Sequence, residues 1–135
     1  MKKAEIEKTI IELAQKIDAP LELLPDYNSS RGNGHPHIEF DDLGLFHLVV
    51  SERGEEYDRK IINSENDLLY YVFSNITFQM ASKFESQNRI EGQDFRRLLF
   101  DKQEDLLGKL NKEWKAKERD EHHNILKLNP FDDTI

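Results

Sequence analysis

The feature that most constrains the fold of this chain is a long apolar segment that begins near Asp67 and continues to Phe84. One set of its side chains recurs at three- and four-residue spacing, which predicts the buried stripe of a helix. That set is Leu69, Val72, Phe73, Ile76, Met80 and Phe84. Tyr71 and Phe78 lie on roughly the opposite side of the same helix. A helix that is apolar on two sides is expected to lie between two layers, such as a sheet and another helix.

Three short segments before this helix are expected to form an antiparallel β-meander. Apolar and acidic side chains alternate at residues 38–40, as in a half-buried strand. Residues 45–50 are apolar on both faces, which is typical of a central strand covered on both sides. Residues 57–62 are more polar and resemble an edge strand. Turn-forming sequences at residues 41–44 and 53–54 separate the three segments.

Two further helices are expected, one on each side of the segments already described. Residues 3–18 carry one apolar stripe, and Pro20 ends that helix. Residues 26–36 are rich in turn formers and are predicted to be a loop. A second amphipathic helix begins near Asp94, which is a good N-cap residue, and carries a broad apolar stripe that includes Trp114.

The expected fold class is therefore α+β, with a meander of about three strands packed against two long helices and an N-terminal helix. We expect one domain over residues 1–135, since a chain of this length fits one domain. Its expected parts are an N-terminal helix and turn, the meander, the two long helices, and a tail that packs back on the body. These parts occupy residues 1–25, 35–63, 64–122 and 123–135.

Composition narrows the classes of function. The absence of cysteine excludes disulfides and cysteine-based zinc sites and favours a reducing compartment. The N-terminus lacks the apolar core of a signal peptide, and no apolar run approaches the ~18 residues of a membrane span. A cytoplasmic protein without a membrane partner is expected. The net charge of −8 argues against a nucleic-acid partner and favours either a basic partner or simple solubility.

The sequence contains no recognisable catalytic device. It has no cysteine nucleophile, no Gly-x-Ser-x-Gly elbow, no His-Glu-x-x-His pair and no phosphate-binding or dinucleotide fingerprint. The Gly32-Asn33-Gly34 segment is too short to cradle a phosphate and is followed by His-Pro instead of a helix. We therefore predict no enzyme, no catalytic residue and no cofactor.

Histidines provide the alternative hypothesis, a small metal-dependent enzyme. His35 and His37 alternate along a segment where Glu39 or Asp41 would supply a further ligand, although a metal site needs three or four ligands. Residues 122–123 add two histidines at what is expected to be a fraying helix end. Histidines in loops and at helix ends are usually solvated, so no metal site is predicted.

Other polar residues are more simply explained by structure. His47 lies in the central strand and is expected to be a hydrogen-bonded, partly buried histidine, with a partner contact as the alternative. Arg96 and Arg97 open a helix, where positive charge is unfavourable against the helix dipole. Asp94 and Asp101 are near enough to neutralise them, and a partner or anion contact is the second interpretation.

The densest acidic group surrounds the predicted turn at residues 53–54. It consists of Glu52, Glu55, Glu56 and Asp58, with Tyr57 among them. A solvated turn and edge strand would explain this composition. The functional interpretation is a rim that steers a basic partner, with Tyr57 as an anchor, because aromatic residues flanked by charge are common at the centres of interfaces. These five residues are our predicted partner-binding site.

Several short motifs occur in a fixed order along the chain. They are Glu52-Arg53-Gly54, Leu68-Leu69-Tyr70-Tyr71-Val72-Phe73, Met80-Ala81, Asn88-Arg89, Asp94-Phe95-Arg96-Arg97, Phe100, Trp114 and Asn129-Pro130-Phe131-Asp132. This ordered set, over about residues 35–133, resembles the immunity protein 63 family. These are bacterial proteins encoded beside polymorphic toxins, and they protect the producing cell and its kin.

The resemblance implies that the protein binds and neutralises the C-terminal domain of a cognate toxin stoichiometrically, without catalysis. It carries over no defined active site. Many such toxins are basic nucleases, which an acidic inhibitor would meet at an accelerated rate. The sequence leaves open the identity of the toxin and the oligomeric state of the inhibitor.

Overall fold

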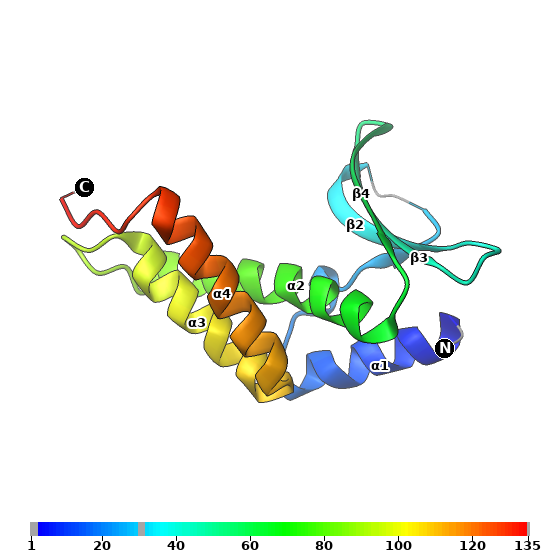
Figure 1. The fold of residues 1–135 in the computed structure, drawn as a ribbon, viewed down its shortest axis with the longest axis horizontal. Coiled ribbons are helices and arrows are strands. Elements are labelled where there is room, and N and C mark those ends of the chain that lie inside the picture. The colour runs from blue at the N-terminus through cyan, green and yellow to red at the C-terminus, as the bar shows by residue number, and fades with distance from the viewer. Residues whose placement is uncertain (1–2, 30–31, 135) are drawn as a thin grey trace. The chain divides into compact units, whose positions relative to one another are not determined.

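The computed structural model describes residues 3–29 and 32–134 and shows an α+β protein, as predicted (Figure 1). Within this part of the chain, four α-helices accompany a four-stranded sheet. The helices are α1 (Lys3–Lys16), α2 (Glu65–Gln87), α3 (Phe95–Leu110) and α4 (Lys112–Leu128), with a short 3-10 helix, η1, at Leu21–Leu23. The strands are β1 (Asp26–Tyr27), β2 (Asn33–Phe40), β3 (Phe46–Glu52) and β4 (Glu55–Ile62). Residues 1–2 of the expected N-terminal part, 30–31 of the expected loop and 135 of the expected tail lie outside the described residues.

The chain forms two compact units. Unit 1 comprises Met1–Gln15 and Pro20–Val72, and unit 2 comprises Lys16–Ala19 and Phe73–Ile135. The helix α2 therefore contributes its first residues to unit 1 and the remainder to unit 2. The expectation of a single domain over residues 1–135 stays a prediction. None of the helices described is both long enough and apolar enough to cross a bilayer.

The sheet contains the predicted meander and one additional strand. Its order is β1-β2-β3-β4, and β2, β3 and β4 pair antiparallel in sequence order. The additional strand, β1, pairs parallel with β2 and places Asp26 beside His37. It lies in the segment that turn-forming residues had marked as a loop. A two-residue edge strand is too short to show alternation of its own, so the pattern could not predict it.

The core of unit 1 confirms that β3 is covered on both faces near its centre. Ile38, Phe46 and Leu48 are buried on one face of the sheet, and Val49 and His37 are buried on the other. Toward the start of β3, Leu45 and His47 are only half-buried. Buried side chains of α1 and of the start of α2 complete the core of this unit. They are Ile6, Ile10, Ala14, Leu68, Leu69, Tyr70 and Val72.

Unit 2 contains α3 and α4 side by side as a helical hairpin (Figure 1). The sequence had predicted one helix through this region, with a tail from residue 123. The chain instead leaves helical geometry at Asn111, whose φ is −165°, and its Oδ1 accepts hydrogen bonds from the N–H groups of Glu113 (2.8 Å) and Trp114 (3.2 Å). This N-cap starts α4, which then runs to Leu128.

The two apolar stripes predicted for α2 differ in their burial. Phe73 and Ile76 are buried, and the Phe73 ring stacks on Trp114 at 6.3 Å between centroids. Phe78, from the opposite stripe, is 48% exposed, and Tyr71 is half-buried. The second stripe is therefore not buried along its length as expected.

Candidate functional site

The predicted partner-binding residues lie on the hairpin formed by β3 and β4. Its turn consists of Arg53 and Gly54, whose φ angles are +52° and +80°. Positive φ at both central residues is the geometry of a type I′ turn, which suits the twist of a two-residue hairpin. This tight turn places Glu52 directly opposite Glu55 across the ladder.

A β-bulge interrupts the ladder just below the turn. Val50 pairs with Asp58, but Ser51 pairs with Glu56, so Tyr57 is the extra residue on β4. Bulges of this kind redirect a side chain and disturb the edge of a sheet. Tyr57 is 64% exposed, which is consistent with its predicted role as an anchor for a partner.

The bulge divides the predicted site between the two faces of the hairpin. Side chains alternate along a strand, and residues opposite each other share a face. Glu52 and Glu55 therefore share a face, and Asp58, paired with Val50, lies on that same face. Glu56, paired with Ser51, lies on the other face. The sequence had treated the four acids as a single group.

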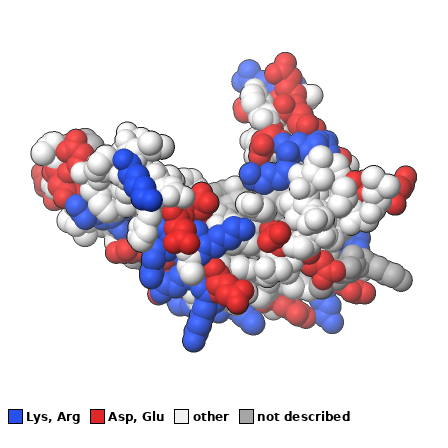
Figure 2. Space-filling view, in the orientation of Figure 1, with Lys and Arg blue, Asp and Glu red and all other residues white. Residues whose placement is uncertain are grey.

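The acids on the two faces also differ in their partners. Glu52, Glu55 and Asp58 are exposed, and their side chains make no hydrogen bond or ion pair with any residue that the structure describes. Glu56 accepts hydrogen bonds from Arg59, with Nη2 at 2.6 Å and Nε at 3.0 and 3.1 Å. Figure 2 shows acidic atoms along this hairpin with basic atoms close by. We call Glu52, Glu55 and Asp58 the free acidic triad.

Arg59 connects the hairpin to a polar network on its face of the sheet. Its Nη1 donates to Glu39 Oε1 at 3.0 Å and to His47 Nδ1 at 2.9 Å. Because a guanidinium only donates, Nδ1 of His47 accepts, and the Nε2–H group donates to Asp41 Oδ2 at 2.7 Å. His47 is therefore hydrogen-bonded and half-buried, as expected.

These contacts keep the carboxylates of the network ionised. Hydrogen bonds from Arg59 and then His37 lower the pKa of Glu39, and the bond from Arg59 lowers the pKa of Glu56. The hydrogen bond from His47, followed by the bond from the Leu45 N–H, lowers the pKa of Asp41. The network therefore fixes charged side chains in place beside the hairpin.

The histidines proposed as metal ligands do not form a ligand set. The Nε2–H group of His35 donates to the backbone oxygen of Leu24 at 2.6 Å, while that of His37 donates to Glu39 Oε2 at 2.8 Å. Across residues 3–29 and 32–134, no group of three or more His, Cys, Asp or Glu side chains is arranged to hold a metal ion. His37 Nδ1 is buried without a hydrogen-bond partner among these residues, but one nitrogen is not a site.

Sequence reasoning missed a buried polar network in unit 2. His122 is 3% exposed, stacks on Phe100 with 3.9 Å between ring centroids, and bonds Glu104 through Nδ1 at 2.7 Å. Gln103 bonds His122 Nε2 at 3.0 Å and donates to Glu118 at 3.2 Å. The signal was the four-residue spacing of Trp114, Glu118 and His122, which places them on one helical stripe. Their burial indicates a structural role.

The two arginines at the start of α3 are also structural. Arg96 donates to Asp94 at 2.8 Å, as expected, whereas Arg97 pairs with Asp133 at 3.0 Å instead of Asp101. Asp94 also accepts a hydrogen bond from the Asp132 N–H at 2.9 Å. The Phe131 ring lies close to Phe100 and beneath Arg97. The C-terminal segment therefore packs back on unit 2, as the sequence predicted for the tail.

The geometry defines an α+β protein whose β3–β4 hairpin carries three exposed acids, Glu52, Glu55 and Asp58, without side-chain partners among the described residues. The sequence profile of the family described as Immunity protein 63 matches residues 41–124, which is more than half of the chain. The chain therefore belongs to the immunity protein 63 family, as the ordered motifs predicted. No curated protein and no solved structure matches the chain. The matched region includes all of β3, β4, α2 and α3 and thus the complete hairpin.

Proposed function

We propose that this chain is a cytoplasmic immunity protein that binds the C-terminal domain of its cognate toxin and neutralises it stoichiometrically, without catalysis. Membership of the immunity protein 63 family supports this function. The observation that carries the choice of surface is the free acidic triad, three exposed carboxylates without partners in the described structure. Charges that do not stabilise the fold are available to a basic partner.

The two faces of the hairpin have different roles in the proposed complex. The free acidic triad attracts the toxin over a distance and accelerates association, an effect that salt screens. Tyr57, directed outward by the bulge, supplies apolar contact area and a hydroxyl group. Glu56 is already held by Arg59, so it requires little ordering when the partner binds.

The function is tested by co-expression with the C-terminal domain of the toxin encoded beside this gene. We expect the two proteins to co-purify as a complex of fixed stoichiometry and the cells to grow. Failure of both co-purification and growth rescue would refute the proposed function. Turnover of the toxin or of another substrate by the purified chain would refute the stoichiometric mechanism.

The binding surface is tested by neutralising the free acidic triad with Glu52→Gln, Glu55→Gln and Asp58→Asn. A matched control neutralises three exposed acids of unit 2, Glu91, Asp120 and Glu121, so both variants gain the same charge. We expect the triad variant to associate about tenfold more slowly at low salt and to lose most of its salt dependence. Equal effects of the two variants would place the contact on another surface. Tyr57→Ala should act mainly on the dissociation rate.

A further inference from the structure

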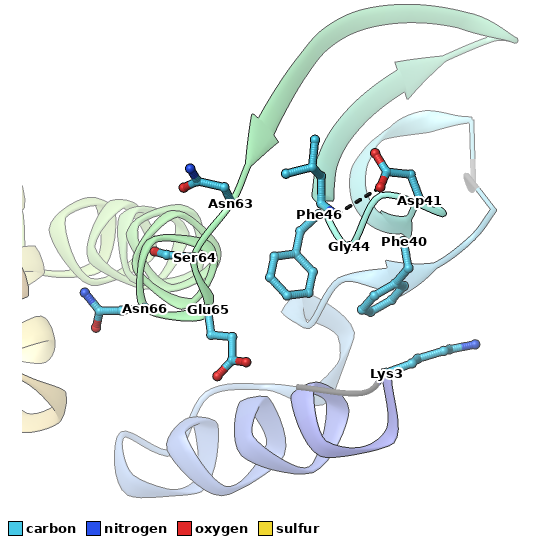
Figure 3. Close-up of a pocket in the computed structure, with 10 residues that line it drawn as sticks. Lys3, Phe40, Asp41, Gly44, Phe46, Asn63, Ser64, Glu65 and Asn66 are labelled. Atoms are coloured by element: carbon cyan, nitrogen blue, oxygen red, sulfur yellow. Dashed lines mark hydrogen bonds between the residues drawn. The ribbon is translucent and has the colours of Figure 1, made fainter.

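The opposite end of the same ladder borders a hollow in unit 1. Its volume is about 710 Å³, and its walls come from the start of α1, the turn between β2 and β3, and residues 63–66. Figure 3 shows the rings of Phe40 and Phe46 descending from the sheet, with Glu65 reaching from α2 and Lys3 lying on α1. Phe40 and Phe46 meet edge to face at 5.8 Å between centroids. These two rings give the hollow an apolar floor.

A second hollow adjoins the first. It has a volume of about 390 Å³ and shares Leu45 and Asn63 as lining residues with the larger one. Ile61 and Tyr71 form further parts of its wall, and Ile61 is 62% exposed. The two hollows lie next to each other around Leu45 and Asn63, and we call them together the Asn63 groove. An exposed isoleucine beside an apolar floor offers surface that a partner could remove from water.

The charged residues of the Asn63 groove are mostly acidic. Among the described residues, Asp41, Glu65 and Asp67 line it together with one base, Lys3. A second base, Lys60, borders it, with Nζ 5.1 Å from the ring centroid of Tyr71. Hydrogen bonds from His47 and from backbone N–H groups hold the pKa of Asp41 below its usual range, so it stays a carboxylate at neutral pH. The Asp67 side chain makes no hydrogen bond or ion pair with the residues described. The groove therefore combines apolar walls with a net negative rim.

The groove lies on the same strand as the surface proposed above for the toxin. β3 begins at Phe46 in the groove and ends at Glu52 in the free acidic triad. At ~3.3 Å per residue these two points are roughly 20 Å apart, which one interface of ordinary size spans. The groove residues from Asp41 onward also fall within the family match over residues 41–124.

We propose that the Asn63 groove is a second contact for the toxin, and that it receives a lysine or arginine side chain flanked by apolar residues. This inference rests on the proposed function. The apolar walls would hold the aliphatic stem of the basic side chain, and the acidic rim would meet its charged end. A second copy of this chain is a poorer occupant, because two acidic surfaces of a protein with net charge −8 repel each other.

The occupant can be identified by placing a photo-cross-linking amino acid at Asn63, which is exposed and lines both hollows. The matched control position is Gln87, an exposed residue at the end of α2 that does not line the groove. In the complex with the toxin C-terminal domain, we expect position 63 to cross-link to a toxin peptide containing a basic residue beside apolar ones. Cross-links to an acidic peptide, to a second copy of this chain or to nothing would overturn the inference.

Substitution gives an independent measurement. Asn63→Arg fills the groove and repels a basic side chain, so the toxin should bind at least about tenfold more weakly, while Gln87→Arg should leave binding unchanged. Thermal melting checks that both variants fold. If Asn63→Arg does not fold, the cross-link at position 63 decides the question. When the unaltered protein binds the toxin and Asn63→Arg binds equally well, the groove inference alone fails. When the unaltered protein does not bind, the proposed function fails and this inference fails with it.

Discussion

Three buried acids of unit 2 and the free acidic triad of the hairpin have opposite surroundings. In unit 2, Glu85 bonds Arg89, Asp94 bonds Arg96, and Glu118 accepts from Gln103; all three acids are buried. On the hairpin, the free acidic triad is exposed and unpaired among the residues described. The same residue types therefore hold the chain together in one region and remain available to a partner in the other. Pairing and burial, more than acidic composition, distinguish the two roles.

The largest effect on stability is expected from Glu118→Ala. This change leaves the Ser74 hydroxyl and the Gln103 amide without their buried acceptor, and the free energy of unfolding should fall by about 3 kcal/mol. Urea denaturation monitored by circular dichroism measures it. Glu121→Ala is the matched control, because Glu121 is exposed on the same helix and its loss should cost less than about 0.5 kcal/mol. Equal losses would show that burial does not separate the two kinds of acid.

Asp94→Ala should give the next largest effect, a loss of about 2 kcal/mol near pH 7. Asp94 is the N-cap of α3 and also anchors the Asp132 N–H. The hydrogen bond from Arg96, with backbone bonds from Asp132 and Arg96, holds the pKa of Asp94 below that of the unfolded chain, about 4.

The sign of the pH dependence follows from that depressed pKa. The contribution of Asp94 is fully present above the unfolded pKa and is lost as pH falls toward the folded pKa. The difference in stability between the unaltered protein and Asp94→Ala should therefore narrow below about pH 4. Denaturation curves at pH 7, 5 and 3 measure this difference, and a constant value would contradict the assigned role of the carboxylate.

Neutralising the free acidic triad should have the smallest effect on the free energy of unfolding, although its effect on toxin association is large. Neutralising Glu52, Glu55 and Asp58 together should change the free energy of unfolding by less than about 0.5 kcal/mol. A slight increase is expected because Glu52 lies directly opposite Glu55, and opposed like charges destabilise a ladder. A loss above about 1 kcal/mol in the same denaturation assay would place the triad among the structural acids and remove the contrast with unit 2.

Periodicity in the sequence was sufficient for the main elements of the fold. Alternation around Ile38 and the two-sided apolar run at residues 45–50 predicted β2 and β3, and the Arg53-Gly54 turn predicted the hairpin. The end of α3 was missed because the apolar stripe continues through Asn111, and only the side-chain cap reveals the break. Hydrophobic periodicity does not reveal the bounds of an element when those bounds depend on a capping side chain or on pairing with a neighbouring strand.

The candidate site was predicted in composition but not in arrangement. The acids and Tyr57 were identified from their density, whereas their division between two faces depends on one bulged residue that the sequence does not mark. The Asn63 groove was missed for a different reason. Its walls come from separate segments, such as Lys3, Phe40 and Ile61, and no local pattern connects them.

The bulge at Tyr57 has a consequence for how such a protein changes over generations. The pairs below it, such as Val49 with Arg59, keep their register whatever side chain occupies the extra position. Under the proposed function, replacements at the tip could therefore follow a toxin that diversifies while the inherited sheet stays intact. Under the same proposal, a new target would require changes at a few codons and no new scaffold.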